Sequence, residues 1–229
     1  MNKLTKISAA TFMFFTVAGQ AMAADDNVDV KVTGQIVPPA CVPAVSGGAV
    51  FDYGVIKAGS LASDDFTVLS KKTLDFSVNC DAAMKIAFKA IDGRSDTKVN
   101  PVGKSILDVI VEENTPVYGL GVTSGNKKIG GYRILVFSAQ IDGAKKTQGL
   151  ISHDNGATWK ESIYLWMNPG EGIVSSLGDK SSETPSVPAA LKTITGKIQI
   201  QAAINKGSEL DLSKVTNLDG LASIQIVYL

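Results

Sequence analysis

The chain has little of what most enzymes use. Among its 229 residues there are one histidine, His153, and two cysteines. A single histidine excludes most Ser-His-Asp and Cys-His arrangements and most histidine-based metal sites, and we expect His153 to be an exposed loop residue. The Gly-x-Ser-x-Gly, phosphate-binding glycine-loop and His-Glu-x-x-His patterns are also missing. We therefore expect no catalytic residue, no metal and no cofactor.

Long apolar runs are scarce as well. The apolar stretch at 7–18 is shorter than the roughly 20 residues of a membrane-spanning helix. Two lysines precede it, and the small-x-small sequence Ala-Met-Ala follows at 21–23, which is the three-part pattern of a secretory signal. We expect residues 1–23 to be a signal peptide and 24–229 to form one exported domain with no membrane span.

The mature chain has no excess of basic charge. The whole chain has 22 basic and 22 acidic residues, and the signal holds two of the lysines, so 22 − 2 = 20 basic residues remain. Binding of nucleic acid needs a basic patch, so nucleic acid is not an expected partner.

Both cysteines, Cys41 and Cys80, lie in the exported part of the chain. An oxidising periplasm or exterior favours a disulfide between them, and with two cysteines only one pairing is possible. A closed loop of about 40 residues stabilises the fold by roughly 4 kcal/mol in chain-entropy estimates. Two free buried thiols are the alternative.

Glycine and polar turn residues interrupt the chain about every ten residues. Between them run short segments of alternating apolar and polar residues, and sustained helical periodicity is absent. The pattern predicts strands over 28–33, 73–80, 84–90, 105–111, 118–122, 132–141, 163–167, 197–204 and 222–229. The stretch 168–190, which contains several glycines and prolines, predicts a long connection before the last two strands. We expect an all-β fold, a single β-sandwich.

The C-terminus is an alternating strand, 222–229, that runs to the last residue. Ile224, Ile226 and Tyr228 share one face of it. An apolar strand at the edge of a sheet invites pairing with another chain. The strand is therefore either an inner strand of a complete sandwich, or its outer edge is open for a strand donated by another polypeptide.

Several segments resemble chaperone-usher pilins, and in particular the fimbrial-like proteins that are longer single domains. Val-Thr-Gly-Gln-Ile-Val at 32–37, leading into Pro-Pro-Ala-Cys41, is similar to the opening strand and first cysteine of pilins. Phe-Asp-Tyr-Gly-Val-Ile at 51–56 is similar to the segment after their first long loop, and Phe-Ser-Val-Asn-Cys at 76–80 to the strand with the second cysteine. Tyr228 takes the penultimate place, where pilins usually have an aromatic residue.

The resemblance implies an immunoglobulin-like sandwich that lacks its last strand. A periplasmic chaperone would hold it, an usher would assemble it, and a neighbouring pilus subunit would complete it, in a fimbrium or at the cell surface. By analogy, Ile224, Ile226 and Tyr228 would lie beside the groove for the donated strand. The terminal carboxylate of Leu229 would be gripped by basic residues of the chaperone.

The N-terminus departs from the pilin pattern, because only residues 24–27 precede the alternation of Val28, Val30 and Val32. Either these valines are themselves the donor strand, or the subunit receives a strand without giving one. The second option would place the chain at a tip, or outside a fibre.

Ser152, Asp154, Gly156 and Trp159 fit the Ser-x-Asp-x-Gly-x-x-Trp pattern of the Asp-box, a motif known from sialidases and other β-propellers. Asp154 can accept backbone hydrogen bonds, Gly156 can adopt a positive φ, and Trp159 can pack on the returning strand. We expect a structural hairpin. A propeller would need several copies of the motif, so an Asp-box hydrolase is a remote alternative.

Tyr164 and Trp166 are two residues apart, so on a strand they share one face. Packing in the core is the commoner role of such a pair. Exposed, the two rings could stack on a sugar. The alternative to a fimbrial subunit is therefore a carbohydrate-binding surface or periplasmic module with a closed sandwich, whose ligand would be a host glycan.

Overall fold

The computed structural model describes residues 29–37, 39–143, 145–181 and 186–229. The chain divides into two units, residues 1–37 and residues 38–229. In the first unit, residues 29–37 form no strand or helix and their side chains are exposed. The expected signal peptide and Val28 lie outside the described residues.

The second unit is built from β-strands and short 3₁₀ turns, with no α-helix among its described residues. The strands are β1 (Cys41–Val45), β2 (Thr67–Val68), β3 (Lys72–Asp92), β4 (Ser105–Ile106), β5 (Val109–Ile110), β6 (Tyr118–Gly119), β7 (Gly130–Ile141), β8 (Lys145–Ser152), β9 (Lys160–Ser162), β10 (Leu165–Trp166), β11 (Val174–Asp179), β12 (Ala190–Ile204) and β13 (Ala222–Tyr228). The turns are η1 (Ser46–Ala49), η2 (Ala58–Ser60), η3 (Ser95–Thr97) and η4 (Gly207–Glu209). The expectation of an all-β fold is confirmed.

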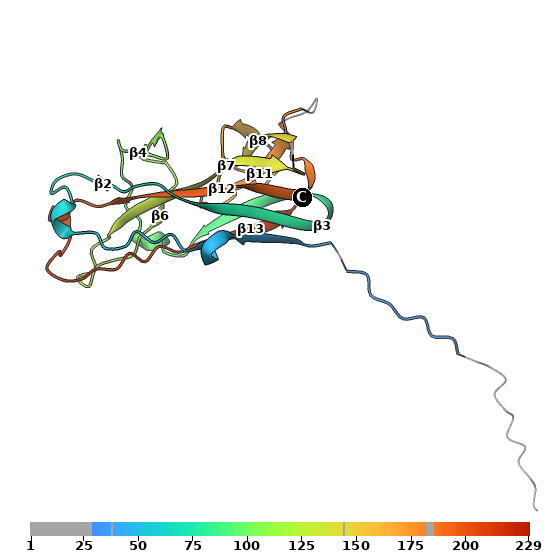
Figure 1. Cartoon of the computed structure of the whole chain (residues 1–229), viewed down its shortest axis with the longest axis horizontal. Helices are drawn as coiled ribbons and strands as arrows, with labels where there is room; N and C mark the ends of the chain where they lie inside the picture. Colours follow the sequence, from blue (N-terminus) through green and yellow to red (C-terminus); the bar gives the residue numbers. More distant parts are fainter. Residues whose placement is uncertain (1–28, 38, 144, 182–185) are drawn as a thin grey trace, which may run out of the picture. The chain divides into compact units, whose positions relative to one another are not determined.

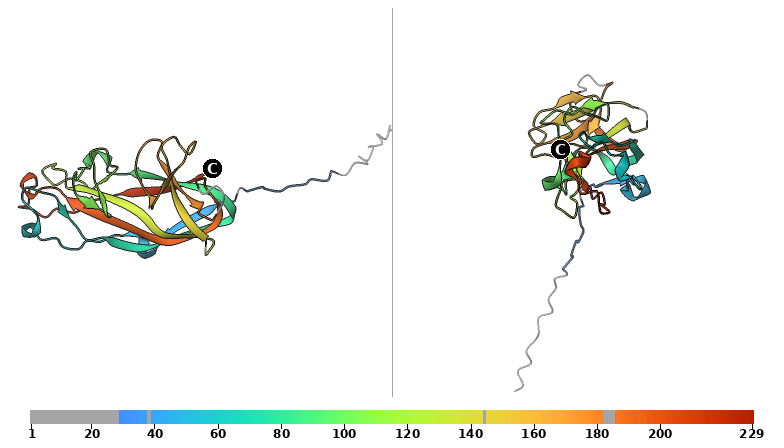
Figure 2. Two further views of the ribbon diagram at one scale, coloured as in Figure 1. Left: turned by 90° about the horizontal axis from the view of Figure 1, so that it is seen from above. Right: turned by 90° about the vertical axis from the view of Figure 1, so that its left-hand side faces the viewer.

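Eleven of the described strands form one sheet in the order β1-β3-β11-β8-β7-β12-β2, with β6 and β10 on β7, β9 on β8 and β13 on β3. Its strands pair antiparallel. Because β3 also pairs with β12, the sheet curls back on itself (Figure 1). Figure 2 shows β3, β7 and β12 running side by side along this unit. The hairpin of β4 and β5 is separate.

β3 belongs to both halves of the curled sheet, which explains its length of 21 residues. Its first part pairs with β1 and β12, and its last part, 86–92, pairs with β13. The sequence predicts two strands here, 73–80 and 84–90, and the structure joins them into one. As a result, β1 and β13 lie along the same strand without pairing with each other.

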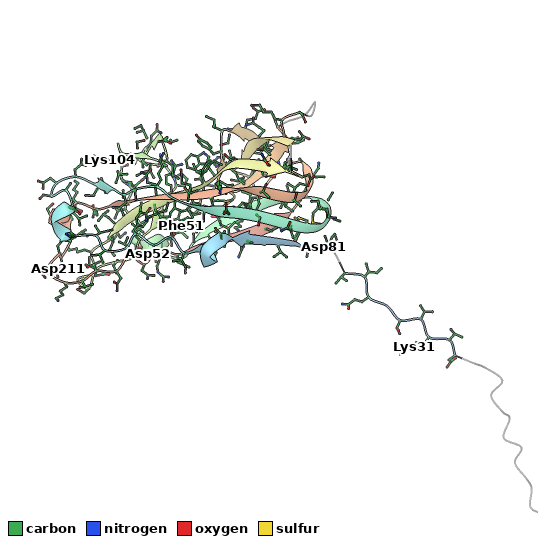
Figure 3. All side chains as sticks on the ribbon, viewed as in Figure 1. Lys31, Phe51, Asp52, Asp81, Lys104 and Asp211 are labelled. Carbon is green, nitrogen blue, oxygen red and sulfur yellow. A yellow bond between two sulfur atoms is a disulfide. The ribbon has the colours of Figure 1, made fainter. Side chains whose placement is uncertain are left out.

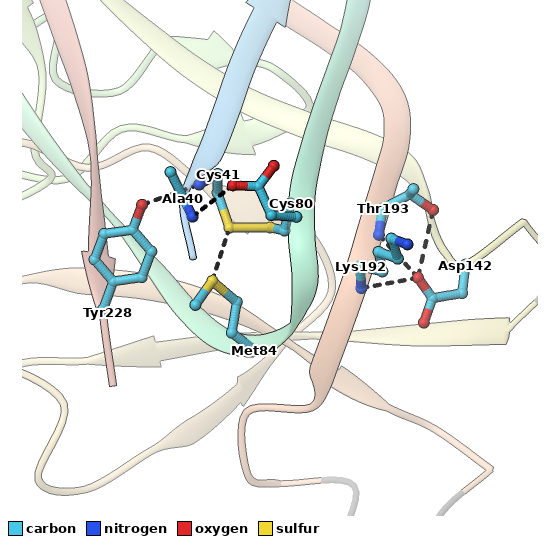
Figure 4. Close-up of a disulfide and its surroundings, with 9 residues drawn as sticks. Ala40, Cys41, Cys80, Met84, Asp142, Lys192, Thr193 and Tyr228 are labelled. Carbon is cyan, nitrogen blue, oxygen red and sulfur yellow. Dashed lines mark hydrogen bonds between the residues drawn. A yellow bond between two sulfur atoms is a disulfide. The ribbon is translucent and has the colours of Figure 1, made fainter. Parts of the chain in front are cut away.

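The predicted disulfide between Cys41 and Cys80 is confirmed, and the two residues lie directly opposite each other on β1 and β3 (Figure 4). The Cys41 N–H donates to the hydroxyl of Tyr228 at 3.0 Å. The Ala40 N–H donates to Oδ2 of Asp81 at 3.1 Å. The start of β1 is therefore joined to the end of β13 beside the disulfide.

The apolar residues form two clusters. The main cluster lies inside the curled sheet and includes Phe76 and Phe88, whose rings meet edge to face with centroids 5.8 Å apart. The second cluster packs Ile106 and Leu107, from the region of the β4–β5 hairpin, onto Leu135 of β7. The hairpin thus covers part of β7.

Three of the sequence predictions are wrong. The single strand expected over 105–111 is two short strands, β4 and β5, because Leu107 and Asp108 form a turn with positive φ between them. The stretch 168–190 is not a single long connection, because it contains β11. The sequence did not predict β11, because Ser175 and Ser176 look like turn residues. Both are buried, and their hydroxyls donate to the carbonyls of Trp166 and Ile86, at 2.6 Å each. Residues 29–33 form no strand, because nothing in the described chain pairs with them. No helix in the described residues is long and apolar enough to cross a bilayer.

Candidate strand-binding groove

A groove of about 840 Å³ opens along one side of the second unit. Two segments line its sides: the first wall, residues 45–61, and the second wall, residues 210–224. Its floor consists of inward side chains of β7 and β12 with two neighbours: Leu120, Ile129, Tyr132, Ile134, Ile198, Ile200, Ala202 and Ile204. The floor belongs to the main hydrophobic cluster, so the groove opens directly onto the core.

The groove lies where β1 and β13 each have one free edge. Both strands pair with β3 on one side, and no other strand among the described residues pairs with either of them. β1 runs from Cys41 away from the disulfide, whereas β13 runs towards it and ends opposite Ile86. Each wall therefore continues an edge strand.

The backbone of both walls has unused hydrogen-bonding capacity. Figure 3 labels Phe51 and Asp52 on the first wall. Here Gly54 N–H donates to Oδ1 of Asp52 at 2.7 Å, but the backbone groups of residues 51–53, 55 and 56 have no protein partner in the described structure. On the second wall, the same holds for the backbone of residues 214–218. These segments are partly to fully exposed, so their backbone groups can bond to water, and another backbone could replace that water along both walls.

Hydrogen bonds join neighbouring segments beyond each end of the groove lining. At one end, Gly207 N–H donates to Ala62 O and Ser208 N–H to Ser63 O, both at 2.9 Å. At the other end is the bond between Cys41 and Tyr228 described above.

The second wall is anchored to the rest of the unit near residue 219. Nε and Nη2 of Arg94 donate to the carboxylate of Asp219 at 2.8 and 3.0 Å. The hydrogen bond from Arg94 lowers the pKa of Asp219 and raises that of Arg94. Asp219 N–H also donates to Leu120 O at 2.9 Å, and Gly93 N–H donates to Leu221 O at 2.8 Å.

The first wall is fixed by its aromatic residues. Phe51 and Tyr53 are partly buried against the main cluster. The hydroxyl of Tyr53 accepts the Ala202 N–H at 3.2 Å, and burial raises the pKa of this tyrosine. Tyr53 therefore ties the wall to β12 while the neighbouring backbone stays free.

The lining is mostly apolar. Asp52 and Lys214 are the charged members among the described residues that line the groove. Val55 and Val215, one on each wall, are 95% and 92% exposed. Apolar side chains this exposed on a groove are typical of a surface that binds a partner.

Residues 30–133 match the family described as protein of unknown function, DUF1120. The chain is also 28% identical to the uncharacterized protein YhcF of Escherichia coli (strain K12), over 100% of both chains. It is 26% identical to the protein GltF of the same organism, over 97% of both chains. The family match begins in the first unit and includes the first wall, β3 and the start of β7.

The residues expected to flank a groove lie on β13 and directly after it. Ile224 lines the groove, and Ile226 packs on the main cluster. Tyr228 is half exposed, and its hydroxyl binds Cys41. The N–H of Leu229 donates to Lys85 O at 3.1 Å. The first wall and the floor were not predicted, since their residues have the pattern of ordinary core and loop segments.

The candidate donor segment is available in the free chain. Its alternating residues Val30, Val32 and Ile36 are 84%, 92% and 100% exposed. β1 begins at Cys41, so the whole alternating stretch precedes the first strand.

The Asp-box residues form the turn between β8 and β9, which pair as a hairpin. Ser152 Oγ donates to Oδ1 of Asp154 at 2.6 Å, and Thr158 N–H donates to the same oxygen at 2.9 Å. These hydrogen bonds lower the pKa of Asp154 to about 2. Gly156 has a φ of 92°, and His153 is exposed in the turn. The polar groups of Ser152 and Asp154 are therefore engaged in hydrogen bonds within the turn.

The aromatic pair lies against the second cluster. Tyr164 and Trp166 are partly buried there, with ring centroids 6.0 Å apart at 81°. The guanidinium of Arg133 lies 3.9 Å from the centroid of Trp166 and covers that face of the ring. Arg133 is 5% exposed, and its Nε and Nη1 have no partner in the described structure. Burial lowers the pKa of Arg133 to about 10. A sugar stacking on this face of Trp166 would have to displace Arg133.

Proposed function

We propose that this chain is an exported, non-enzymatic subunit of the pilin kind. Its fold is an immunoglobulin-like sandwich without a last strand, and a strand donated by another polypeptide completes it. The observation that carries this proposal is the groove, in which an apolar floor lies between two walls with unpaired backbone.

A β-strand is the occupant whose chemistry fits both features. Its backbone would pair with the free groups of residues 51–56 on one side, and with β13 and residues 214–218 on the other. Its alternate side chains would point to the floor and cover Ile134, Ile198 and Ile200. The exposed Val55 and Val215 would then contact the occupant from both walls.

The first unit supports a donor role for the same chain. Val30 and Val32, together with Val28 in the sequence, alternate with polar residues, as a strand with one buried face requires. The exposed backbone of residues 29–37 pairs with no strand of the described chain, so its hydrogen-bonding groups are available to join another sheet. Of the two options left by the sequence, this favours a subunit that both gives and receives a strand.

The partners follow from this proposal. A periplasmic chaperone would fill the groove first and grip the terminal carboxylate of Leu229, and an usher would then exchange it for the segment of a neighbouring subunit. The chain would pass through the periplasm to a fimbrium or the cell surface. The half-exposed position of Leu229 leaves its end accessible to such a partner.

A synthetic peptide with the sequence of residues 24–37 tests the proposal. Refolded protein is mixed with this peptide, or with a control peptide carrying Val32→Asp and Ile36→Asp. The first peptide should raise the melting temperature by several degrees and slow amide exchange in residues 214–218, because ligands that bind only the folded state stabilise it. No shift with millimolar peptide, together with unchanged exchange, contradicts the proposal.

A further inference from the structure

Among the described residues of the groove floor, Tyr132 of β7 is the one with a polar atom in its side chain, and the others are aliphatic. Tyr132 is 6% exposed, and its ring stacks on that of Tyr118, with centroids 4.9 Å apart and 20° between the planes. It lies opposite Ala202 of β12, so backbone pairing also fixes its place. A rigid ring therefore carries one hydroxyl into an apolar floor.

The hydroxyl of Tyr132 has no hydrogen-bond partner within the part of the chain that the structure describes. Two other tyrosines packed in or on the main cluster do have partners. The hydroxyl of Tyr53 accepts the Ala202 N–H at 3.2 Å, and that of Tyr118 donates to Met167 O at 2.6 Å. The Tyr132 oxygen is not one of the unpartnered polar atoms sealed from solvent. Since Tyr132 lines the groove, its hydroxyl is available to an occupant.

The ring of Tyr132 reaches from the floor to the second wall. A Cβ built on Gly220 would lie 2.8 Å from Cε1 of Tyr132 and 3.3 Å from Cζ, the carbon that bears the hydroxyl. Glycine at position 220 thus leaves room for the hydroxyl end of the ring at the foot of this wall. Burial raises the pKa of Tyr132, so the hydroxyl stays protonated and can donate as well as accept a hydrogen bond.

The occupant of the groove decides whether this hydroxyl keeps a hydrogen bond. In the free protein, water can reach it through the groove opening. A strand laid over the floor excludes this water, and a buried hydroxyl without a partner weakens binding by about tenfold or more. A strand with a hydroxyl or amide side chain at the position above Tyr132 avoids this loss.

We infer that the Tyr132 hydroxyl selects a strand with a hydroxyl or amide side chain at one inward position. This inference rests on the proposed function, because it requires a strand in the groove. The even-numbered residues 28–36, which form the apolar face of the candidate donor segment, have no hydrogen-bonding group in their side chains. The preferred occupant is therefore a strand of a different polypeptide and not the segment of a second copy.

Five variants of peptide 24–37 test the inference, each with one hydroxyl added to the inward face: Val28→Thr, Val30→Thr, Val32→Thr, Gly34→Ser and Ile36→Thr. Their dissociation constants are measured by calorimetry on the wild type and on Tyr132→Phe. Comparing one peptide on two proteins cancels the change in apolar contact that the peptide itself carries. For one variant, Tyr132→Phe should weaken binding about tenfold more than it does for the unmodified peptide. An equal effect of Tyr132→Phe on all six peptides overturns the inference.

Tyr118→Phe is the matched control, because Tyr118 stacks on Tyr132 but is not part of the groove lining. It should lower the melting temperature, since it breaks the hydrogen bond to Met167 O, and it should affect all six peptides equally. Tyr132→Phe breaks no hydrogen bond within the described chain, so its melting temperature should match that of the wild type. A tenfold selective effect of both substitutions would trace the selection to the packing of the two rings and overturn the role of the hydroxyl.

Binding to the wild type alone gives a readout that does not need Tyr132→Phe. One of the five variants should bind the wild type more tightly than the unmodified peptide does. If all five bind more weakly, the inference fails and the proposed function stands. If none of the six peptides binds, the proposed function fails, and the inference fails with it.

Discussion

Two isoleucines of β12 test whether the groove is open in solution. Ile194 is 0% exposed and lies in the closed part of the main cluster. Ile200 is 8% exposed and forms part of the groove floor. The same substitution, isoleucine to alanine, can therefore be compared in one strand at two sites of similar burial.

The expected costs differ because only one site is sealed. Loss of the transfer free energy of the removed carbons costs about 2 kcal/mol at both sites. At Ile194 the substitution also leaves a closed cavity. Isoleucine-to-alanine substitutions lower the free energy of unfolding by about 2–5 kcal/mol, and those that leave a cavity lie in the upper part of this range. At Ile200 the removed volume merges with the groove, so that no new cavity is sealed off. We expect Ile194→Ala to lower the free energy of unfolding by about 4 kcal/mol and Ile200→Ala by about 2 kcal/mol.

Urea denaturation with a constant m value measures both costs. Saturating peptide 24–37 should raise the cost of Ile200→Ala and leave that of Ile194→Ala unchanged, since only the floor is covered by an occupant. Equal costs for the two substitutions without peptide would refute the reasoning, because Ile200 would then lie in a sealed core.

Three further outcomes are expected. Replacing Cys41 and Cys80, which are 39 residues apart, by serine should lower the free energy of unfolding by about 4 kcal/mol, measured in urea against the oxidised wild type. Hydrogen bonds in the turn lower the pKa of Asp154 from 3.8 to about 2. The stability that ionised Asp154 contributes is therefore complete above about pH 4 and is lost as the pH falls towards 2. Asp154→Ala should remove this part of the pH dependence, seen in urea melts between pH 2 and 5. Arg133→Met should leave stability unchanged or raise it by about 1 kcal/mol, because it removes a buried charge that has no acidic partner among the described residues. A loss above about 2 kcal/mol contradicts this.

Much of the sheet follows from local sequence. β13 alternates apolar and polar residues over much of its length and β7 contains a continuous apolar run, and the prediction places both strands within two residues at each end. The disulfide follows from two cysteines in an exported chain. β11 was missed because its two central serines look like turn residues until their buried acceptors are known.

The candidate groove was predictable only at one edge. The apolar alternation of Ile224 and Ile226 points to a strand that needs a partner, and the sequence contains that information. Ile134, Ile198 and Ile200 look like any inward residues of a sandwich. The sequence could not show that the space above them is left empty, since this depends on where residues 45–61 and 210–221 run.

The sequence by itself determined the all-β class, the disulfide, the terminal strand and the turn chemistry of the Asp-box, because each depends on residues that are neighbours or on a pairing with one solution. The tertiary structure decided that β1 and β13 flank a common opening and that Arg133 covers one face of Trp166. These contacts join residues far apart in the chain. Whether a backbone group is paired depends on which segments the fold brings beside it, and no residue type in the sequence specifies that alone.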